Sequence, residues 1–477
     1  MNLSLNICKD YTKFDHQIIL IDNGTRLSSL GLSSGDADSA TKFFDAKVNH
    51  IYQRNAGGRT LYIVKLDSSK AEFQLLEESR KAGNTVNKLL NSLKITEASV
   101  YNASKKAKLA GAFAEGLLLS NYEFLKYKTK DKNEKTLVSL QLDGRSSNKK
   151  ELEEISKVAT ANFLARTLIN EPVSYLTAVQ LSEEIKKAGK EHGFSVEIFD
   201  KKKIEGLKMG GLLAVNKGSI DPPTFTILEY KGYRPTNKKP IVLVGKGVVY
   251  DTGGLSLKPT PNSMDMMKCD MSGAAAVVGI FVAAAQLKLP VHLVGLIPAT
   301  DNRPGMNAYA PGDVIEMMSG LNVEMLNADA EGRMILADAL HYAKRYQPEL
   351  VIDFATLTGA AVRAIGSLAS AYMGTANNNV KRKLETSADN VYERLIHFPL
   401  WEEYGEWIKS DVADIKNIGP GEAGHITAGK FLEHFTDYPW LHLDIAGTAY
   451  LMKEDSYRGK YGTAVGVRMI TDFLRNY

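Results

Sequence analysis

The feature that most constrains the fold is a series of short apolar segments beyond residue 170, which alternate with helical stretches. Several of these segments are apolar on both faces, as in a sheet that helices cover on both sides. The alternation predicts a mixed, largely parallel sheet, and ligands gather at the carboxyl ends of the strands in such sheets. The predicted strands are 195–199, 224–230, 240–245, 291–297 and 350–356.

The first 145 or so residues show the same alternation and end in a polar region. Strongly polar stretches at 130–135 and 145–150 precede a helical pattern that runs to Pro172, which marks a domain boundary. We expect an α/β protein of two domains, each a mixed, mostly parallel sheet flanked by helices. The predicted parts are strands at 17–22, 60–66 and 136–142, helices at 70–93, 107–125 and 151–168, an N-terminal domain over 1–148, a connecting helix over 149–170 and a second domain over 171–477.

Charge and composition exclude several classes of protein. The 477 residues carry a net charge of only +4, far from the concentrated basic charge of a dedicated nucleic-acid binder. The two cysteines, Cys8 and Cys269, are too few for a disulfide framework. Residues 1–10 lack a secretory signal, so we expect a cytoplasmic protein. The most apolar run, 272–285, falls short of the roughly 18 residues of a membrane span, which predicts a buried core helix and no membrane partner.

Three segments place charged residues at predicted junctions between strands and helices. Lys246, Asp251 and Lys258 follow an apolar strand in a loop with four glycines, and Asp270 precedes an Ala-rich helix. The third segment, Asn327-Ala-Asp-Ala-Glu-Gly-Arg333, precedes another helix and contains Asp329 and Glu331. Taken singly, each has an ordinary explanation, because an Asp before a helix is usually a cap and a Lys or Arg is usually solvated.

Together, these residues favour a metal site. A bare cluster of four carboxylates would repel itself, and its charge matches that of two divalent ions. Carboxylate oxygens suit Zn, Mn, Mg or Co, and a pair of such ions can activate a water for hydrolysis. A lysine can join them only as the neutral amine, which requires its pKa to fall. The chain has no His-Glu-x-x-His motif, which argues against a single-zinc site.

These motifs closely resemble those of the leucyl aminopeptidase family, also called the cytosol aminopeptidases. The resemblance rests on Val244-Gly-Lys-Gly, Asp251-Thr-Gly-Gly-Leu-Ser-Leu-Lys258, Met267-Lys-Cys-Asp-Met and the highly specific Asn327-Ala-Asp-Ala-Glu-Gly-Arg333. It continues through Asp353-Phe-Ala-Thr-Leu-Thr-Gly359 and His442-Leu-Asp-Ile-Ala-Gly447, so it covers the second half of the chain. The first 150 residues carry no diagnostic string.

The resemblance implies a metal-dependent aminopeptidase that releases N-terminal Leu, Met and similar residues from peptides with a free amino terminus. It makes 171–477 the catalytic domain, with two divalent ions, Zn or Mn, per chain. It further implies a homohexamer, a dimer of trimers with the N-terminal domains at the periphery.

The resemblance also assigns roles to individual residues. Asp251 and Glu331 would bridge the two ions. Lys258 resembles the lysine that polarises the scissile carbonyl and stabilises the oxyanion, and Arg333 the arginine that holds a bicarbonate for proton relay. The remaining assignments are Lys246, Asp251, Asp270 and Glu331 as ligands of the tighter ion, Asp251, Asp329 and Glu331 as ligands of the exchangeable ion, and Met267, Thr356, Leu357, Gly359 and Ala446 at the substrate pocket.

The sequence departs from the family pattern in two places. The interval from Lys258 to Asp270 is one residue longer than usual, which places an extra residue in the loop 259–263. The usual Asn-Thr-Asp and Asp-Met-Gly-Gly strings are altered to Asn327-Ala-Asp329 and Asp270-Met-Ser-Gly273. Neither change removes an expected ligand.

Three other interpretations of the sequence are weaker. Asp251-Thr-Gly253 resembles the triplet of aspartic proteases, but that chemistry needs a second Asp and no second triplet exists. Gly31-Leu-Ser-Ser-Gly35 fits the nucleophile elbow with Ser33 as nucleophile, although a loop is the better interpretation. A metal-stabilised or DNA-binding regulator would need a basic stripe. The Lys126–Lys135 stretch and the pair Lys149 and Lys150 are short and lie among acids, so we expect no nucleic-acid partner.

Overall fold

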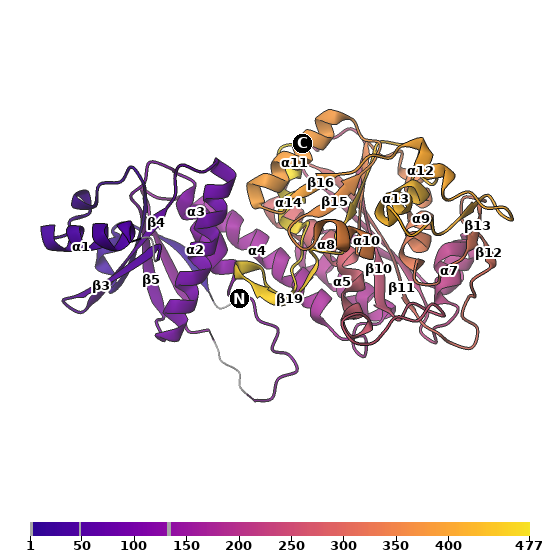
Figure 1. Ribbon diagram of the computed structural model, residues 1–477, viewed down its shortest axis with the longest axis horizontal. Helices are drawn as coiled ribbons and strands as arrows, with labels where there is room; N and C mark the ends of the chain where they lie inside the picture. The colour runs from indigo at the N-terminus through magenta and orange to yellow at the C-terminus, as the bar shows by residue number, and fades with distance from the viewer. Residues whose placement is uncertain (1–2, 47–48, 131–134) are drawn as a thin grey trace. The chain divides into compact units, whose positions relative to one another are not determined.

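A computed structural model describes residues 3–46, 49–130 and 135–477, and it divides the chain into two compact units (Figure 1). The first unit comprises Met1–Thr160 with the short segments Asn390–Tyr392 and Glu454–Gly459, and the second comprises the rest. The division falls inside helix α4, Lys149–Asn170. Of the sequence features discussed above, residues 1–2 of the N-terminal segment and 131–134 of the lysine stretch lie outside the described residues.

The first unit is built on a six-stranded sheet in the order β1-β6-β5-β2-β4-β3, in which only the β3–β4 pair is antiparallel. The predicted strands and helices all appear, while β1, β3, β5, α1 and the short helices η1 and η2 come in addition. The elements are β1 Ser4–Cys8, η1 Tyr11–Lys13, β2 His16–Asp22, η2 Leu27–Leu30, α1 Ser34–Asp45, β3 Ile51–Ala56, β4 Arg59–Leu66, α2 Glu72–Ser92, β5 Glu97–Asn102, α3 Leu109–Leu119 and β6 Ser139–Asp143.

Helices α2 and α3 pack unusually closely because each has a glycine at the contact. A β-carbon on Gly83 would lie 2.2 Å from the carbonyl oxygen of Phe113, and one on Gly116 would lie 2.1 Å from that of Arg80. Neither backbone atom can move aside as a flexible side chain could, so the two glycines set the spacing of this helix pair.

The second unit contains a large mixed sheet in the order β16-β15-β18-β14-β9-β11-β8-β7, with β10 also paired to β11. The neighbours β18, β14, β9 and β11 run parallel, which confirms the predicted α/β class. The strands of this sheet are β7 Ser195–Phe199, β8 Thr224–Lys231, β9 Ile241–Gly245, β10 Gly247–Asp251, β11 His292–Asn302, β14 Leu350–Ala355, β15 Ser370–Met373, β16 Leu395–His397 and β18 Trp440–Asp444.

Helices and smaller sheets complete the second unit. The helices are α5 Ala178–His192, α6 Lys201–Gly206, α7 Gly210–Asn216, η3 Met264–Met271, α8 Ser272–Leu287, α9 Glu331–Ala343, η4 Lys344–Tyr346, α10 Gly359–Ile365, α11 Asn378–Val391, α12 Glu402–Glu406, α13 Gly424–Glu433 and α14 Val467–Arg475. The short helix η5 Ser456–Arg458 lies in the segment Glu454–Gly459, which belongs to the first unit. The short strands are β12 Asp313–Glu316, β13 Asn322–Met325, β17 Ile415–Lys416, β19 Tyr450–Asp455 and β20 Gly459–Gly462.

The central strands are buried because helices cover them on both sides. Val242 and Val244 of β9 share a core cluster with α9, whereas α8 approaches the end of β9 so closely that a β-carbon on Gly245 would lie 2.6 Å from the α-carbon of Ala274. The segment Met264–Leu287 is long and apolar enough to cross a membrane, but 83% of its apolar window is buried inside the protein. The burial of this segment therefore fits the predicted core helix.

The parallel strands bring their carboxyl ends to one edge of the sheet. Lys246 directly follows β9, and Asp251 ends β10. Strand β11 runs five residues beyond its predicted end and finishes at Asn302. Thr356 directly follows β14. This edge of the sheet therefore collects the charged residues that the sequence places after strands.

Candidate metal centre

Lys246 lies at the centre of a buried ionic cluster. Its Nζ atom lies 2.8 Å from Oδ1 of Asp270 and 2.8 Å from Oε1 of Glu331, and it donates a hydrogen bond of 2.9 Å to the carbonyl oxygen of Thr356. Lys246, Asp270 and Glu331 are each at most 3% exposed. The interpretation of Lys246 as a solvated surface charge is therefore excluded.

Lys258 joins the two remaining carboxylates. Its Nζ atom lies 2.9 Å from Oδ2 of Asp251 and 2.5 Å from Oδ1 of Asp329. Asp251, Asp329 and Glu331 each offer a carboxylate oxygen, and these three oxygens lie within 4.8 Å of one another. The structure thus gathers the six residues that the motifs predicted, from three segments of the chain.

The two aspartates that precede helices are not caps. Met271 is the N-cap of α8 and Ala330 that of α9, and neither helix receives a side-chain capping bond. The Asp270 carboxylate instead accepts hydrogen bonds from Lys246 and from Oγ1 of Thr356, at 2.8 and 2.7 Å. Asp270 and Asp329 are therefore directed toward the cluster.

The cluster fits divalent cations. Four carboxylates face only two lysines, which leaves an excess of negative charge in a buried place. Oδ2 of Asp270 and Oε2 of Glu331 are buried without a hydrogen-bond partner among the described residues. Buried carboxylate oxygens without partners are costly, and hard cations such as Mn²⁺, Mg²⁺ or Zn²⁺ would satisfy them.

The electrostatics of the cluster follow from burial and mutual repulsion. Burial, together with the charges of Glu331 and Asp251, raises the pKa of Asp329 to about 7, and burial also raises the pKa of Asp251 and Asp270. Burial alone would lower the pKa of Lys246 and Lys258, but the facing carboxylates outweigh it and raise both. Without cations, both lysines are therefore ammonium ions, and Lys246 can act as a ligand only if bound cations reverse this shift.

Arg333 lies on α9 two residues after Glu331 and is 6% exposed. One guanidinium nitrogen donates a hydrogen bond of 2.8 Å to the carbonyl oxygen of Asn417, and Nε is buried with no hydrogen-bond partner among the described residues. Burial lowers its pKa to about 10, against the opposing charges of Glu331 and Asp444. An unpartnered buried guanidinium donor suits an anion.

The predicted pocket residues lie in three segments of the chain. Thr356 contacts the cluster directly through Lys246 and Asp270. The amides of Leu357 and Ala446 both donate to Oδ1 of Asp444, at 3.1 and 3.2 Å, so this carboxylate ties their two loops together. Gly359 begins α10, and Met267 is half-buried in η3.

Two buried asparagines at the site were not predicted. The Asn302 amide donates to Oδ1 of Asp251 and to the carbonyl oxygen of Ala328. Asn417 accepts hydrogen bonds from the amides of Leu326 and Asn327 with its Oδ1 and donates to the carbonyl oxygen of Asn327. Asn302 could have been noticed at a strand's carboxyl end, whereas nothing in the sequence around Asn417 signals its role.

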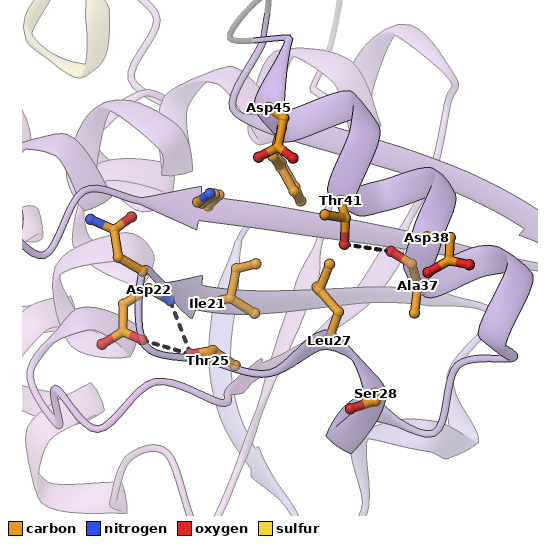
Figure 2. A pocket seen from close by; sticks show the side chains of 12 residues that line it. Ile21, Asp22, Thr25, Leu27, Ser28, Ala37, Asp38, Thr41 and Asp45 are labelled. Atoms are coloured by element: carbon orange, nitrogen blue, oxygen red, sulfur yellow. Dashed lines mark hydrogen bonds between the residues drawn. The ribbon is translucent and has the colours of Figure 1, made fainter.

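A separate cavity of about 330 Å³ lies in the first unit, between the turn after β2 and helix α1 (Figure 2). Its polar residues include Asp22, whose Oδ1 already accepts hydrogen bonds from Thr25 and from the amide of Gly24. It contains none of the predicted site residues. Ser33, the residue of the nucleophile-elbow interpretation, is the N-cap of α1 and accepts a hydrogen bond from the amide of Asp36, which supports the loop interpretation.

Asp338 is a buried carboxylate that anchors α9, the helix that carries Glu331. Its oxygens accept hydrogen bonds from the amides of Leu212 and Met318, at 3.0 and 2.9 Å. Burial raises its pKa to about 7 despite these bonds. The folded protein therefore holds a proton that the unfolded chain releases, so this group's contribution to stability is full at low pH and is lost as the pH rises from about 4 through 7.

We expect Asp338→Asn to lower the free energy of unfolding by about 1 to 3 kcal/mol, because an amide cannot accept both hydrogen bonds equally well. In the variant, the free energy of unfolding should also lack the pH dependence that Asp338 contributes. Urea unfolding at pH 5 and pH 8, with chelator present, measures both effects. Equal pH dependence in the two proteins would show that Asp338 does not titrate in this range.

An oxygen-rich, buried carboxylate cluster beside a lysine ammonium is the kind of site found in metal-dependent hydrolases. Comparisons with known proteins agree with this class. The model of the cytosol aminopeptidase family's catalytic domain matches residues 163–471, and that of its N-terminal domain matches residues 70–131.

Individual proteins and solved structures are similar to nearly the whole chain. A probable cytosol aminopeptidase of Chlorobaculum tepidum is 43% identical over an alignment that covers 96% of this chain and 94% of the relative. Among solved structures, a mutant of tomato leucine aminopeptidase has a TM-score of 0.88 at 29% identity and covers 100% of this chain and 97% of its own. The bottromycin maturation enzyme BotP in complex with Mn has a TM-score of 0.85 at 28% identity, over 97% of this chain and 99% of its own.

The chain therefore belongs to the cytosol aminopeptidase family, as its motifs predicted, and its activity is that of a metal-dependent aminopeptidase.

Proposed function

We propose that this chain is a two-metal aminopeptidase that releases N-terminal Leu, Met and similar residues from peptides. The observation that carries the proposal is the buried cluster of four carboxylates and two lysines, in which one oxygen of Asp270 and one of Glu331 have no hydrogen-bond partner among the described residues. Lys246, Asp251, Asp270 and Glu331 would hold the tighter ion, and Asp251, Asp329 and Glu331 the exchangeable one. Zn or Mn suits these donors, and the Mn named in the BotP structure supports Mn.

When bound, the cations would polarise the substrate carbonyl and lower the pKa of an attacking water. Lys258 carries a positive charge that no neutral residue here could replace, and it would stabilise the negative charge that develops on the carbonyl oxygen. Thr356 holds Asp270 by a hydrogen bond of 2.7 Å and so fixes the direction of that carboxylate. Arg333 would bind bicarbonate through Nε, which has no partner in the part of the chain that the structure describes, and would place the anion to accept a proton.

The substrate's first side chain would occupy a pocket formed by Met267, Thr356, Leu357, Gly359 and Ala446. The support for this pocket is the shared tie of Leu357 and Ala446 to Asp444, together with the contact of Thr356 to the cluster. An apolar lining favours Leu and Met over charged side chains.

Further proposals rest on membership of the family. We place catalysis in residues 171–477, with 149–170 as the connecting helix and 1–148 as a separate N-terminal domain. We also propose a cytoplasmic homohexamer that acts on peptides and has no nucleic-acid or membrane partner. Light scattering that gives a stable monomer at working concentration would contradict the hexamer.

The function is tested by the hydrolysis of leucine amide and of its N-acetylated form, before and after treatment with chelator. The free amine should be needed, because by resemblance to the family it binds beside Asp270. We expect cleavage of the free form only, its loss on metal removal and its recovery with Mn²⁺ or Zn²⁺. Equal cleavage of the acetylated substrate, or full activity without metal, would contradict the proposal.

A further inference from the structure

Asn302 is the last residue of β11 and is completely buried at the edge of the cluster. Its side-chain nitrogen Nδ2 donates to Oδ1 of Asp251 at 2.8 Å and to the carbonyl oxygen of Ala328 at 2.9 Å. Both partners are acceptors, so only the NH₂ group of the amide can face them. Asn302 thereby links two of the three segments that supply the cluster.

The first of these hydrogen bonds affects how Asp251 presents its carboxylate. Oδ1 of Asp251 accepts from Asn302 and also from the amide of Gly253, both at 2.8 Å. Oδ2 lies 2.9 Å from Nζ of Lys258 inside the cluster. Two donors on one oxygen prevent the carboxylate from turning, and they leave Oδ2 directed at the other charged groups.

The second hydrogen bond acts on the loop that carries Asp329. The carbonyl oxygen of Ala328 accepts from Asn302 and also from the hydroxyl group of Tyr309, at 3.0 Å. The backbone oxygen of Asn302 in turn accepts from the amide and the hydroxyl group of Thr252. One residue therefore fixes the position of Asp251 relative to Asp329.

The other side of the amide shows that this arrangement has a cost. Oδ1 of Asn302 is buried with no hydrogen-bond partner among the described residues, close to Gly254, where a β-carbon would lie 2.7 Å away. An unpartnered buried oxygen destabilises a fold. Because an apolar residue of similar size would avoid this cost, the two hydrogen bonds of Nδ2 are the feature that requires asparagine here.

We propose that Asn302 is a positioning residue for metal binding, which holds the carboxylate of Asp251 and the loop of Asp329 at the spacing that the cations require. This inference rests on the proposed two-metal function and adds a residue that is not itself a ligand. Outer hydrogen-bond partners of this kind typically change metal affinity 10- to 100-fold when they are removed.

Asn237 offers a matched control, because it contacts the opposite end of β11 from Asn302. It is also buried, donates to the carbonyl oxygens of Lys239 and His292, and accepts from the amide of His292, where β11 begins. Asn237→Ala removes a buried amide of the same kind without contact to the cluster. A purely structural role for Asn302 would give both variants the same phenotype.

The test is the affinity of the full-length, chelator-treated protein for Mn²⁺, measured by calorimetry without substrate, for wild type, Asn302→Ala and Asn237→Ala. Thermal melting should show that both variants lose stability. We expect Asn302→Ala to bind Mn²⁺ about 10- to 100-fold more weakly and Asn237→Ala to bind as wild type does. Tyr309→Phe, which removes only the second donor to Ala328, should leave the affinity close to that of wild type.

The outcomes separate the two claims. If wild type binds neither Mn²⁺ nor, in the same titration, Zn²⁺, the proposed function itself fails. If wild type and Asn302→Ala bind Mn²⁺ equally, the function stands and the inference about Asn302 is overturned. If Asn302→Ala does not fold, Asn302→Asp takes its place, because it keeps the size of the side chain and places an oxygen against two acceptors. Its affinity for Mn²⁺ should fall at least as far as expected for Asn302→Ala. Wild-type affinity in Asn302→Asp would overturn the inference.

Discussion

Replacing Lys258 by alanine should lower the turnover of leucine amide by a factor of roughly 100 to 1,000, the loss typical of removing one oxyanion stabiliser. Lys258 is paired with Asp251 and Asp329 through its ammonium group and is not an expected ligand. Metal content should therefore be unchanged, and the reduced turnover should appear in kcat more than in KM. Steady-state kinetics and elemental analysis on the same preparation measure both.

Lys430 is the matched control for this variant. It is another buried lysine of the second unit, paired with Glu433 and Glu402 and not with the cluster. Lys430→Ala should cost stability and leave kcat within a few-fold of wild type. A Lys258→Ala enzyme of normal turnover would show that Lys258 stabilises no charge in the reaction.

Replacing Glu331 by alanine should have a larger effect and a different signature. Glu331 is 2% exposed, interacts with Lys246, and offers an oxygen to the same group as Asp251 and Asp329. In the proposed two-metal site, its removal would take away a bridging carboxylate and leave the cations short of one ligand and one charge. We expect fewer than two ions per chain and activity near background, by elemental analysis beside kinetics.

Asp338→Asn serves as the control for Glu331, since Asp338 is a buried carboxylate on the same helix with no contact to the cluster. It should reduce stability and keep both metals.

Glu331→Gln separates charge from shape, because it keeps the length of the side chain and removes the negative charge. Normal metal content in Glu331→Ala would contradict the bridging role.

The sequence predicted much of the fold because the apolar residues of its buried strands and helices form recognisable runs and repeats. Strand β9 is buried on both faces and appears as a continuous apolar run. Strand β14 is equally buried and is interrupted only by Asp353, so the place of both in a covered parallel sheet follows directly. The edge strands β1 and β3 were missed, since half-exposed short strands lack such a run. The end of β11 was also missed, because its last residues are polar although they are buried.

The cluster was predictable for a different reason. Lys246, Asp251 and Glu331 stand in local motifs, each at a junction between a strand and a helix. Asn302 and Asn417 act through contacts to residues 51 and 90 positions away, and no local pattern reports such a contact. The motif alone does not distinguish a helix cap from a cluster residue at Asp270, and the structure places its carboxylate against Lys246.

The most direct test of the account is a titration of chelator-treated wild-type protein with Mn²⁺, in which bound ions per chain and hydrolysis of leucine amide are followed together. The four carboxylates and two lysines predict that activity rises to its maximum as occupancy reaches two ions per chain. Full activity at one ion per chain, or at none, would contradict the two-metal site.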